Sequence, residues 1–514
     1  MNDTLAGVVS DLLPSLRPTL QLAPSAPEET HAAVLVDPEL GRRLRLDARG
    51  YQVAQLLDRE QTLDELAERM GSEVAAVRKV IGLFQDLHLL DTDATRAFVD
   101  ASKACDRWQS AHPSEVPLLI REDARFSCTM CGGCCGGHNI GPIQEDVLAG
   151  LADKMAALQQ KTGSKKGLFA RFPVQTGARI QEQVVCHSQG GSCVFLTDEQ
   201  RCLIHQEYGG DAKPRVCRLF PYEFIATPTG VAVSVSPECR GFADARAGAS
   251  LVDQEAELRE LLGIIPTLRR VRPALMLDDT TAMPYEDYET LEDALHDAVD
   301  AHPDHAYEAL LAMRAAIETR RDRSGSGNAA PRDVAELRAQ LDALVGRIQG
   351  IIDEVCAAMR SESETVRIHT ESLQRLAEAL RTLRFDFARV TRPLRKASQR
   401  ALFVEKIHHQ LMGKELTMAP SLVKAMARLS FSWFVARALM VSRARAVKRV
   451  RLTAQDVTDA IAVTTAHFRN QALMQALRVC DDDLVTLFYE GLPALLAHAQ
   501  ELPDDDISLD VYKF

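Results

Sequence analysis

The sequence predicts a mostly α-helical protein that begins with a small winged-helix-like α+β module and contains an irregular cysteine-rich region. Three observations lead to this prediction. Short β-like pieces near the start precede three helical stretches, long apolar stripes at helical spacing fill the second half, and nine of the twelve cysteines fall between Cys128 and Cys239. At about 100–200 residues per domain, the 514 residues suffice for three or four domains.

The first predicted segment, residues 1–95, combines short strands with three helices. Its elements, in chain order, are strands at 34–36 and 44–46 and helices that begin near Ala48, Thr62 and Val74. Thr62 and Glu65 have the spacing of a capping box, in which each side chain satisfies a free backbone amide at the start of a helix. Short strands with three short helices predict the winged-helix-like module.

The chain from about residue 250 onward is predicted to be helical. An apolar stripe there alternates spacings of three and four, which is typical of a buried helix face. Its members are Val334, Leu337, Leu341, Leu344, Ile348, Ile351 and Val355, continued by Leu373, Leu376, Leu380 and Leu383. Because Ser361–Glu364 interrupts the stripe, we expect a helical hairpin rather than a dimerising coiled coil. Ser324–Asn328, before Pro331, has the composition of a flexible linker.

The predicted segments after the N-terminal module are a cysteine-rich domain, a helical segment, a helical hairpin and a helical C-terminal domain, at 126–245, 250–322, 332–395 and 396–514. The last contains an apolar helix around Phe431–Met440 and then a basic run that ends at Arg451. We expect this run to be a solvated helix face rather than a site for an acidic partner. Thr453 and Asp456 are predicted to cap the next helix.

Charge and compartment restrict the function. With 60 basic and 72 acidic side chains, the net charge is −12 at pH 7, and this argues against a nucleic-acid binder because phosphate contacts need clustered Lys and Arg. No apolar run approaches the roughly 20 residues of a membrane helix, and the first residues lack the pattern of an export signal. We therefore expect a cytoplasmic protein without a membrane partner. In that reducing compartment, dense cysteines indicate a metal site rather than disulfides.

The strongest motif is Cys128-x2-Cys131-x2-Cys134-Cys135, followed by two glycines and His138. C-x2-C-x2-C is the spacing with which bacterial ferredoxins hold three corners of a [4Fe–4S] cluster. The glycines permit the close backbone approach that such a loop requires. Because neighbouring side chains diverge, we expect Cys134 and Cys135 to have different roles.

Four later cysteines complete a set of eight candidate metal ligands, namely Cys193, Cys202, Cys217 and Cys239. Eight thiolates could supply two tetrahedral zinc sites, or one iron–sulfur cluster with the remainder in a second metal site or a structural role. We predict that the fold of this region depends on the metal. Cys186 and Cys105 lie outside the pattern, and Cys356 and Cys480 are predicted to be small core hydrophobes.

Charged and imidazole side chains accompany these cysteines. Arg218 and Arg240 each follow a candidate ligand directly, where a guanidinium group can offset thiolate charge, donate hydrogen bonds to sulfur or hold a substrate carboxylate. We therefore name Arg218 and Arg240 as candidate cofactor-binding residues. His138, His187 and His205 are alternative ligands, although a structural role is favoured for each. The pattern identifies no catalytic base.

The cysteine pattern, together with Pro214-x2-Cys217-Arg-x-Phe-Pro221, resembles the cysteine-cluster family described as zinc- or iron-chelating. That family is defined by about eight cysteines, and all eight positions are matched. The resemblance covers residues 126–242 and implies a bound iron–sulfur cluster or zinc. The ferredoxin-like spacing favours a 4Fe–4S cluster.

Two further resemblances concern the rest of the chain. Residues 400–475 are similar in texture to the helical C-terminal part of flagellin lysine N-methylases, although the cysteine spacing differs. The runs 46–57 and 62–67 resemble the peptide-binding module of the pyrroloquinoline-quinone biosynthesis D type. Together they imply a protein-lysine N-methyltransferase that uses S-adenosylmethionine and acts on a protein or peptide. The alternative is a non-catalytic zinc- or iron-binding structural or interaction protein.

Overall fold

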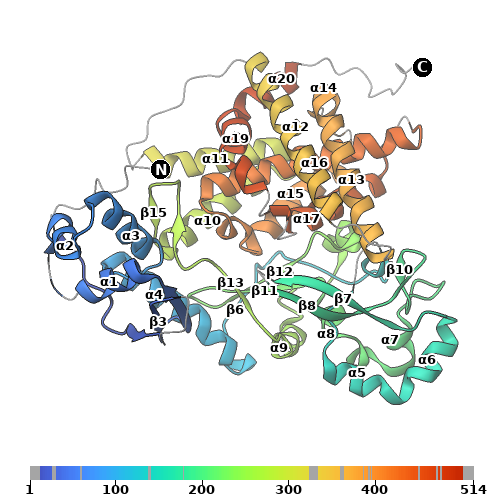
Figure 1. Ribbon diagram of the computed structural model, residues 1–514. Coiled ribbons are helices and arrows are strands. Elements are labelled where there is room, and N and C mark those ends of the chain that lie inside the picture. Colours follow the sequence, from blue (N-terminus) through green and yellow to red (C-terminus); the bar gives the residue numbers. More distant parts are fainter. Residues whose placement is uncertain are drawn as a thin grey trace.

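Helices dominate the structure, as predicted, and the small sheets lie below and beside them (Figure 1). The computed structural model describes residues 12–25, 31–57, 59, 61–136, 140–176, 179–322, 334–358, 364–385, 387–391, 394, 396–449, 452–469, 473–474 and 477–501. The predicted linker Ser324–Asn328 lies outside these residues, as does His138. In the described part of the chain, no helix has both the length and the apolar character needed to cross a membrane.

The N-terminal module is the predicted α+β unit. Strands β2 (Gln21–Pro24), β3 (Ala33–Asp37) and β4 (Arg42–Leu46) form an antiparallel sheet in that order, and helices α1 (Ala48–Leu56), α2 (Leu63–Met70) and α3 (Val74–Asp86) pack on it. Thr62 and Glu65 form the predicted capping box at the start of α2. Alternate residues of β3 are fully buried, because one face of the sheet covers the core of this module.

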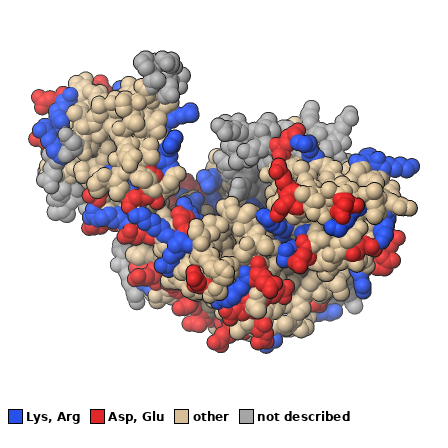
Figure 2. Space-filling model, turned by 90° about the horizontal axis from the view of Figure 1, so that it is seen from below, with Lys and Arg blue, Asp and Glu red and all other residues tan. Residues whose placement is uncertain are grey.

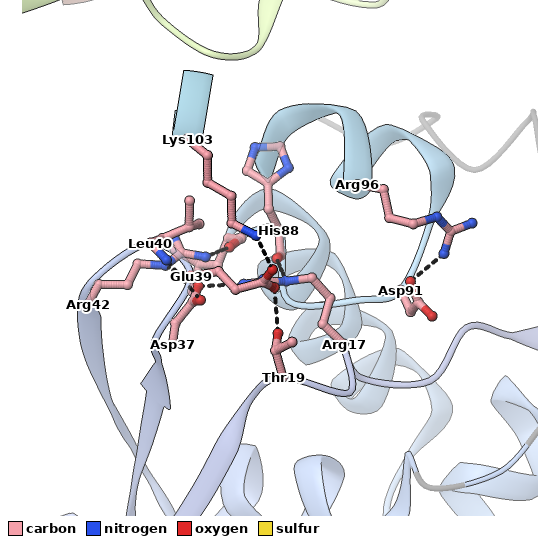
Figure 3. A network of polar contacts seen from close by, with 11 residues as sticks. Arg17, Thr19, Asp37, Glu39, Leu40, Arg42, His88, Asp91, Arg96 and Lys103 are labelled. Carbon is pink, nitrogen blue, oxygen red and sulfur yellow. Dashed lines mark hydrogen bonds and ion pairs between the residues drawn. The ribbon is translucent and has the colours of Figure 1, made fainter. Parts of the chain in front are cut away.

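An ionic network connects this module to helix α4 (Asp93–Ser110), as Figure 3 shows. The buried carboxylate of Asp37 accepts hydrogen bonds from the guanidinium groups of Arg17 and Arg42. Glu39 accepts from Arg17 and also from Lys103, which lies on α4. The first part of α4 is therefore fixed to the sheet of the N-terminal module. The module forms the lobe at the upper left of Figure 2, where acidic and basic side chains are interspersed.

The far end of α4 contacts a central four-stranded sheet. Its strands are arranged in the order β13 (Arg269–Arg270), β11 (Tyr222–Ala226), β12 (Val231–Val235) and β6 (Leu118–Leu119). The indole Nε1 of Trp108, near the end of α4, donates a 2.8 Å hydrogen bond to the carbonyl of Thr227 in the turn between β11 and β12. All five residues of β12 are buried, because helix α15 (Ala397–Met412) packs on this strand.

The helical body shares one hydrophobic core with the central sheet. Its longer helices are α10 (Tyr285–Asp300), α11 (Ala306–Asp322), α12 (Val334–Ala358), α13 (Glu364–Phe385), α16 (Leu422–Ala446) and α17 (Ala454–Arg469), with the short α14 (Phe387–Thr391). Helix α16 is buried along most of its length, because α13 and α17 pack against it. The apolar stripe on α12 and α13 is buried where the two helices pack together. The domain boundaries that we expect stay predictions.

The end of α16 and the start of α17 are joined by ion pairs. Thr453 and Asp456 exchange the predicted capping hydrogen bonds at the start of α17. Asp456 also accepts from Arg449, and Asp459 accepts from Arg443. The basic run after α16 is therefore partly neutralised within the chain, where we had expected only a solvated face.

The cysteine-rich region has a small hydrophobic core of its own. It contains helices α5 (Glu145–Leu151), α6 (Met155–Thr162), α7 (Leu203–Tyr208) and α8 (Arg215–Leu219), and a hairpin of β7 (Phe169–Thr176) and β8 (Arg179–Cys186). A second hairpin follows at once, with β9 (Ser188–Gln189) paired to β10 (Ser192–Cys193). These two hairpins position Cys186, at the end of β8, and Cys193, at the end of β10.

Candidate metal centre

The first four candidate cysteines lie on an exposed loop that begins at a buried anchor. Phe126 is 1% exposed, and its amide donates a 3.0 Å hydrogen bond to the carbonyl of Ala249. Beyond it, Cys128 and Cys131 are exposed to solvent, and the Cys128 sulfur accepts a hydrogen bond from the amide of Met130. A single turn of 3₁₀ helix, Gly133–Cys135, ends the loop.

The backbone of this loop requires glycine and tolerates strain. Gly132 has a φ of 67°, and Met130 adopts a φ of 51°, which side chains other than glycine seldom accept. A Cβ on Gly132 would also stand 2.5 Å from the side-chain oxygen of Gln200. Strained backbone of this kind is typical of functional sites. The loop therefore brings three thiols toward solvent on a backbone that has little room for larger residues.

The later cysteines are positioned by the second hairpin and the short helices after it. Cys186 ends β8, Cys193 ends β10, Cys202 precedes α7 and Cys217 lies within α8. A β-bridge between Gly136 and Ser192 places the end of the loop beside β10, and a second bridge joins Leu196 to Cys202. These backbone contacts bring the end of the loop, with Cys135, beside Cys193 and Cys202, which follow much later in the sequence.

Two pairs of thiols make direct hydrogen bonds. The sulfurs of Cys134 and Cys135 are 4.0 Å apart, and their hydrogen bond lowers the pKa of Cys134 to about 6 while raising the pKa of Cys135. Cys186 and Cys193 form the second pair, in which the hydrogen bond lowers the pKa of Cys193 and raises that of Cys186. One thiol of each pair is therefore favoured as a thiolate, which is the form that binds metal.

Cys239 meets the loop from the side of the helical body. It is 7% exposed and belongs to the large core shared with the central sheet, together with Phe242. Burial, together with the charges of Cys131, Cys134 and Cys128, raises the pKa of Cys239 to about 12. The buried Cys239 thiol is therefore a neighbour of all three of these loop cysteines.

The donor set fits zinc or iron in its chemistry. Thiolates are the ligands that structural zinc sites and iron–sulfur clusters prefer, and all eight predicted cysteines lie in two adjoining groups. Among the residues with described positions, no three Cys, His, Asp or Glu side chains are already arranged to hold a metal ion. Loading would therefore require the thiols to rotate and to release protons, since ligand deprotonation and metal binding are coupled.

The predicted arginines are paired with carboxylates. Arg218 pairs with Asp211 at 2.9 Å, and the Arg240 Nε atom is 3.5 Å from Asp459 of α17. His187 is half-buried, and its amide donates to the carbonyl of Leu168, whereas His205 is exposed on α7. The ligand and cofactor roles of these four residues stay predictions.

Two residues of the site were not identified from the sequence pattern. Cys186 contacts Cys193 although we had placed it outside the cluster. Lys213 carries the positive charge that lowers the pKa of Cys134, where we had expected the neighbouring arginines to act. The same charge opposes the burial that raises the pKa values of Cys202 and Cys217. In the sequence, the one sign of this role is that Lys213 lies four residues before Cys217.

A buried ionic group lies next to the metal-binding region. The guanidinium group of Arg469, at the end of α17, donates hydrogen bonds to Glu223 of β11 and to Glu415. It also donates a 2.6 Å hydrogen bond to the hydroxyl of Ser236, and Glu238 lies 3.6 Å away. Burial raises the pKa of Glu238. Because Glu238 directly precedes Cys239, this group joins the cysteine-rich region to the helical body.

Comparison with known proteins identifies this same region. Residues 127–239 match the CxxCxxCC family model, described as a "putative zinc- or iron-chelating domain". The chain matches no curated protein, and no solved structure resembles it. The match supports a metal-binding cysteine cluster. The suggested likeness to lysine methylases and to a peptide-binding module receives no support from these comparisons.

Proposed function

We propose that residues 128–239 bind zinc or iron through cysteine thiolates and that the metal fastens this region to the helical body. The observation that carries the proposal is the neighbourhood of Cys128, Cys131 and Cys134 around Cys239. The first three lie on the exposed loop, whereas Cys239 belongs to the buried core of the helical body. A metal held by all four would cross-link the two parts, and its binding free energy would become folding free energy.

For the loop cysteines, an iron–sulfur cluster is the favoured occupant. The C-x2-C-x2-C spacing with a distant fourth cysteine is the arrangement of bacterial ferredoxins. An iron–sulfur cluster would supply electron transfer or a rigid cross-link, whereas zinc would supply only the cross-link. Iron, zinc and acid-labile sulfide measured on anaerobically purified protein distinguish the two, since only the cluster contains sulfide.

Single cysteine substitutions test the proposal. Cys131→Ser is expected to lose bound metal, because it removes a ligand from the exposed loop. Cys356→Ser is the matched control, since Cys356 lies on α12 and packs against the helical core. Equal metal contents in the wild type and both variants, or a wild type that holds no metal after anaerobic reconstitution, would contradict the proposal.

Catalysis is a separate hypothesis that the geometry favours less. A lysine methylase needs a cleft for S-adenosylmethionine, and small-molecule sites commonly enclose about 300–1,000 Å³. The hollow beside Cys239, which is lined by Pro237, Phe242, Ala243, Leu402, Thr458 and Ile461, has no room even for a water molecule. Incubation of metal-loaded protein with labelled S-adenosylmethionine and a cell lysate tests the hypothesis. Transfer of label to a protein would establish methylation, and the non-catalytic alternative predicts none.

The peptide-binding role of the N-terminal module and the cytoplasmic location are also proposals. The first is supported by the α+β architecture of the module, and the second by cysteines that are all free thiols, as a reducing compartment keeps them. Pull-down from a cell lysate with residues 1–111 deleted, compared with the full chain, measures what the module contributes to partner binding.

A further inference from the structure

We infer that Cys186 is a metal ligand and that the cysteines form two separate centres, with Cys135 outside both. The hairpin quartet consists of Cys186, Cys193, Cys202 and Cys217. The loop quartet consists of Cys128, Cys131, Cys134 and Cys239. The inference rests on the proposed metal-binding function and deepens it, because it assigns each thiol to one centre.

Mutual proximity defines the hairpin quartet. Cys186 makes a hydrogen bond with Cys193, and each of the six pairs within the quartet is close enough for one thiol to influence the ionisation of the other. Cys186 is 3% exposed at the end of a long hairpin, so its position is well defined by the fold. Four neighbouring thiols, on two hairpins and at two short helices, suit a closed tetrahedral zinc site.

The loop quartet is defined through Cys239. This thiol is influenced by Cys128, Cys131 and Cys134 and by none of the hairpin cysteines among its principal neighbours, although Cys134 itself also lies near Cys193 and Cys217. The three loop thiols are exposed, and their spacing is that of ferredoxin-type ligands. Four thiolates in this spacing suit an iron–sulfur cluster.

The hydrophobic cores separate the two quartets independently of the charges. Cys186 is part of the small core of the cysteine-rich region, and Cys193, Cys202 and Cys217 pack against that core. Cys239 instead belongs to the large core of the helical body. A single centre that held Cys239 together with the hairpin quartet would have to span both cores, whereas two centres leave each cysteine with its own core.

Cys135 lies between the quartets. Its sulfur is 4.0 Å from that of Cys134, and the two share a hydrogen bond. It packs against the same small core as the hairpin quartet and neighbours Cys193 and Cys202. A tetrahedral site accepts four ligands, and the hairpin quartet already supplies them. We therefore assign Cys135 the role of a hydrogen-bond donor to the Cys134 thiolate.

Metal analysis of four proteins tests this assignment. After anaerobic reconstitution with iron, sulfide and zinc, the wild type is expected to hold both zinc and an iron–sulfur cluster. Cys186→Ser should lose the zinc and keep the iron and sulfide, and Cys131→Ser should lose the iron and sulfide and keep the zinc. Cys135→Ser should keep both. Retention of zinc in Cys186→Ser, loss of either metal in Cys135→Ser, or joint loss of both metals in one variant would overturn the inference.

Two controls distinguish the loss of a metal ligand from misfolding of the variant. Cys105→Ser removes another buried thiol, on α4, and is expected to keep both metals. X-ray absorption at the zinc edge of the wild type should show a first shell of four sulfurs, a readout that needs no variant to fold; a shell containing nitrogen or oxygen would overturn the hairpin quartet. A wild type with iron alone refutes the second centre but leaves the proposed function standing, whereas a wild type without metal refutes the proposed function itself.

Discussion

The side chain of Arg240 lies over the backbone of Gly133, so closely that a Cβ on Gly133 would stand 2.6 Å from the Arg240 Cδ atom. The guanidinium group of Arg240 then reaches Asp459 of α17, with its Nε atom 3.5 Å from the carboxylate. Gly133 lies between Cys131 and Cys134. Arg240 therefore joins the centre of the cysteine loop to a helix of the helical body.

Replacement of Gly133 by alanine should disturb this contact. The φ of the residue needs no glycine, so the effect comes from the new methyl group, which would displace Arg240 and weaken its contact with Asp459. Overpacking of this kind costs about 1–3 kcal/mol, measured as a fall in the free energy of unfolding by urea. Gly136→Ala is the matched control, because the nearest atom to its Cβ would be the Ser192 hydroxyl at 3.6 Å, an ordinary van der Waals distance. Equal losses in the two variants would contradict the proposed contact.

Replacement of Arg469 is expected to lower the free energy of unfolding strongly. Arg469→Met leaves the partly buried carboxylates of Glu223 and Glu415 without their cation. Breaking a buried ion pair in this way typically costs about 3–5 kcal/mol. Chemical unfolding monitored by tryptophan fluorescence measures the loss. Arg171→Met removes a solvent-exposed pair with Glu182 and should cost about 0–1 kcal/mol. If Arg469→Met lowers the unfolding free energy as little as the control does, then Arg469 and its carboxylate partners are solvated and the expectation is wrong.

Local sequence signals predicted the N-terminal module well, because short-range chemistry sets its helix ends. The capping box of Thr62 and Glu65 determines where α2 begins, and the alternation of Val34 and Val36 with Leu35 matches the pleat of β3. Both signals depend on neighbours within four residues, so one sequence suffices to find them. The apolar stripe of α12 and α13 is similarly visible, because helical periodicity repeats along the chain.

The role of Cys186 could not be predicted in this way. Counting spacings along the chain groups Cys128 with Cys131 and Cys134, but Cys186 meets Cys193 only because the chain reverses at Gly190–Gly191. The strands β7 and β8 that lead to this turn are rich in polar residues without clear alternation, and their signal is correspondingly weak. The same limit explains Lys213, whose effect on Cys134 depends on tertiary contact.

A pair of histidines should make the helical body sensitive to acid. The Nδ1 atoms of His296 and His408 are 3.1 Å apart, and Arg121 contacts both rings. Burial, followed by the charge of Arg121, lowers the pKa of His296 to about 2, and burial also lowers the pKa of His408. The unfolded chain binds these protons below a pH of about 6.5, whereas the folded chain does not.

Stability should therefore fall as the pH drops below about 6.5. His296 contributes about 1.4 kcal/mol per pH unit in this range, and His408 contributes in the same direction. His296→Gln removes one of the two and should flatten the dependence of the unfolding free energy on pH between about 6 and 4, relative to the wild type. Comparison with the wild type is essential because acid also releases metal from thiolates. Parallel slopes in the variant and the wild type would contradict the assignment.

Asp37 should govern the stability of the N-terminal module alone. Its carboxylate is fully buried and accepts hydrogen bonds from Arg17 and Arg42 (Figure 3). Asp37→Asn keeps the shape but removes the charge, so the buried guanidinium of Arg17 loses its closest counter-ion. The expected cost is about 3–5 kcal/mol, as for other broken buried pairs. Because the module has its own hydrophobic core, the loss should remain local.

Hydrogen exchange followed by mass spectrometry measures this effect region by region. Amides of β3 and α3 should exchange faster in Asp37→Asn, while those of α16 keep their wild-type protection. Asp93→Asn is the control, since that side chain is fully exposed at the start of α4, and it should change neither region. Faster exchange in α16 as well would show that Lys103 and the rest of α4 transmit the loss to the helical body. In that case the module and the body unfold as one cooperative unit despite their separate cores.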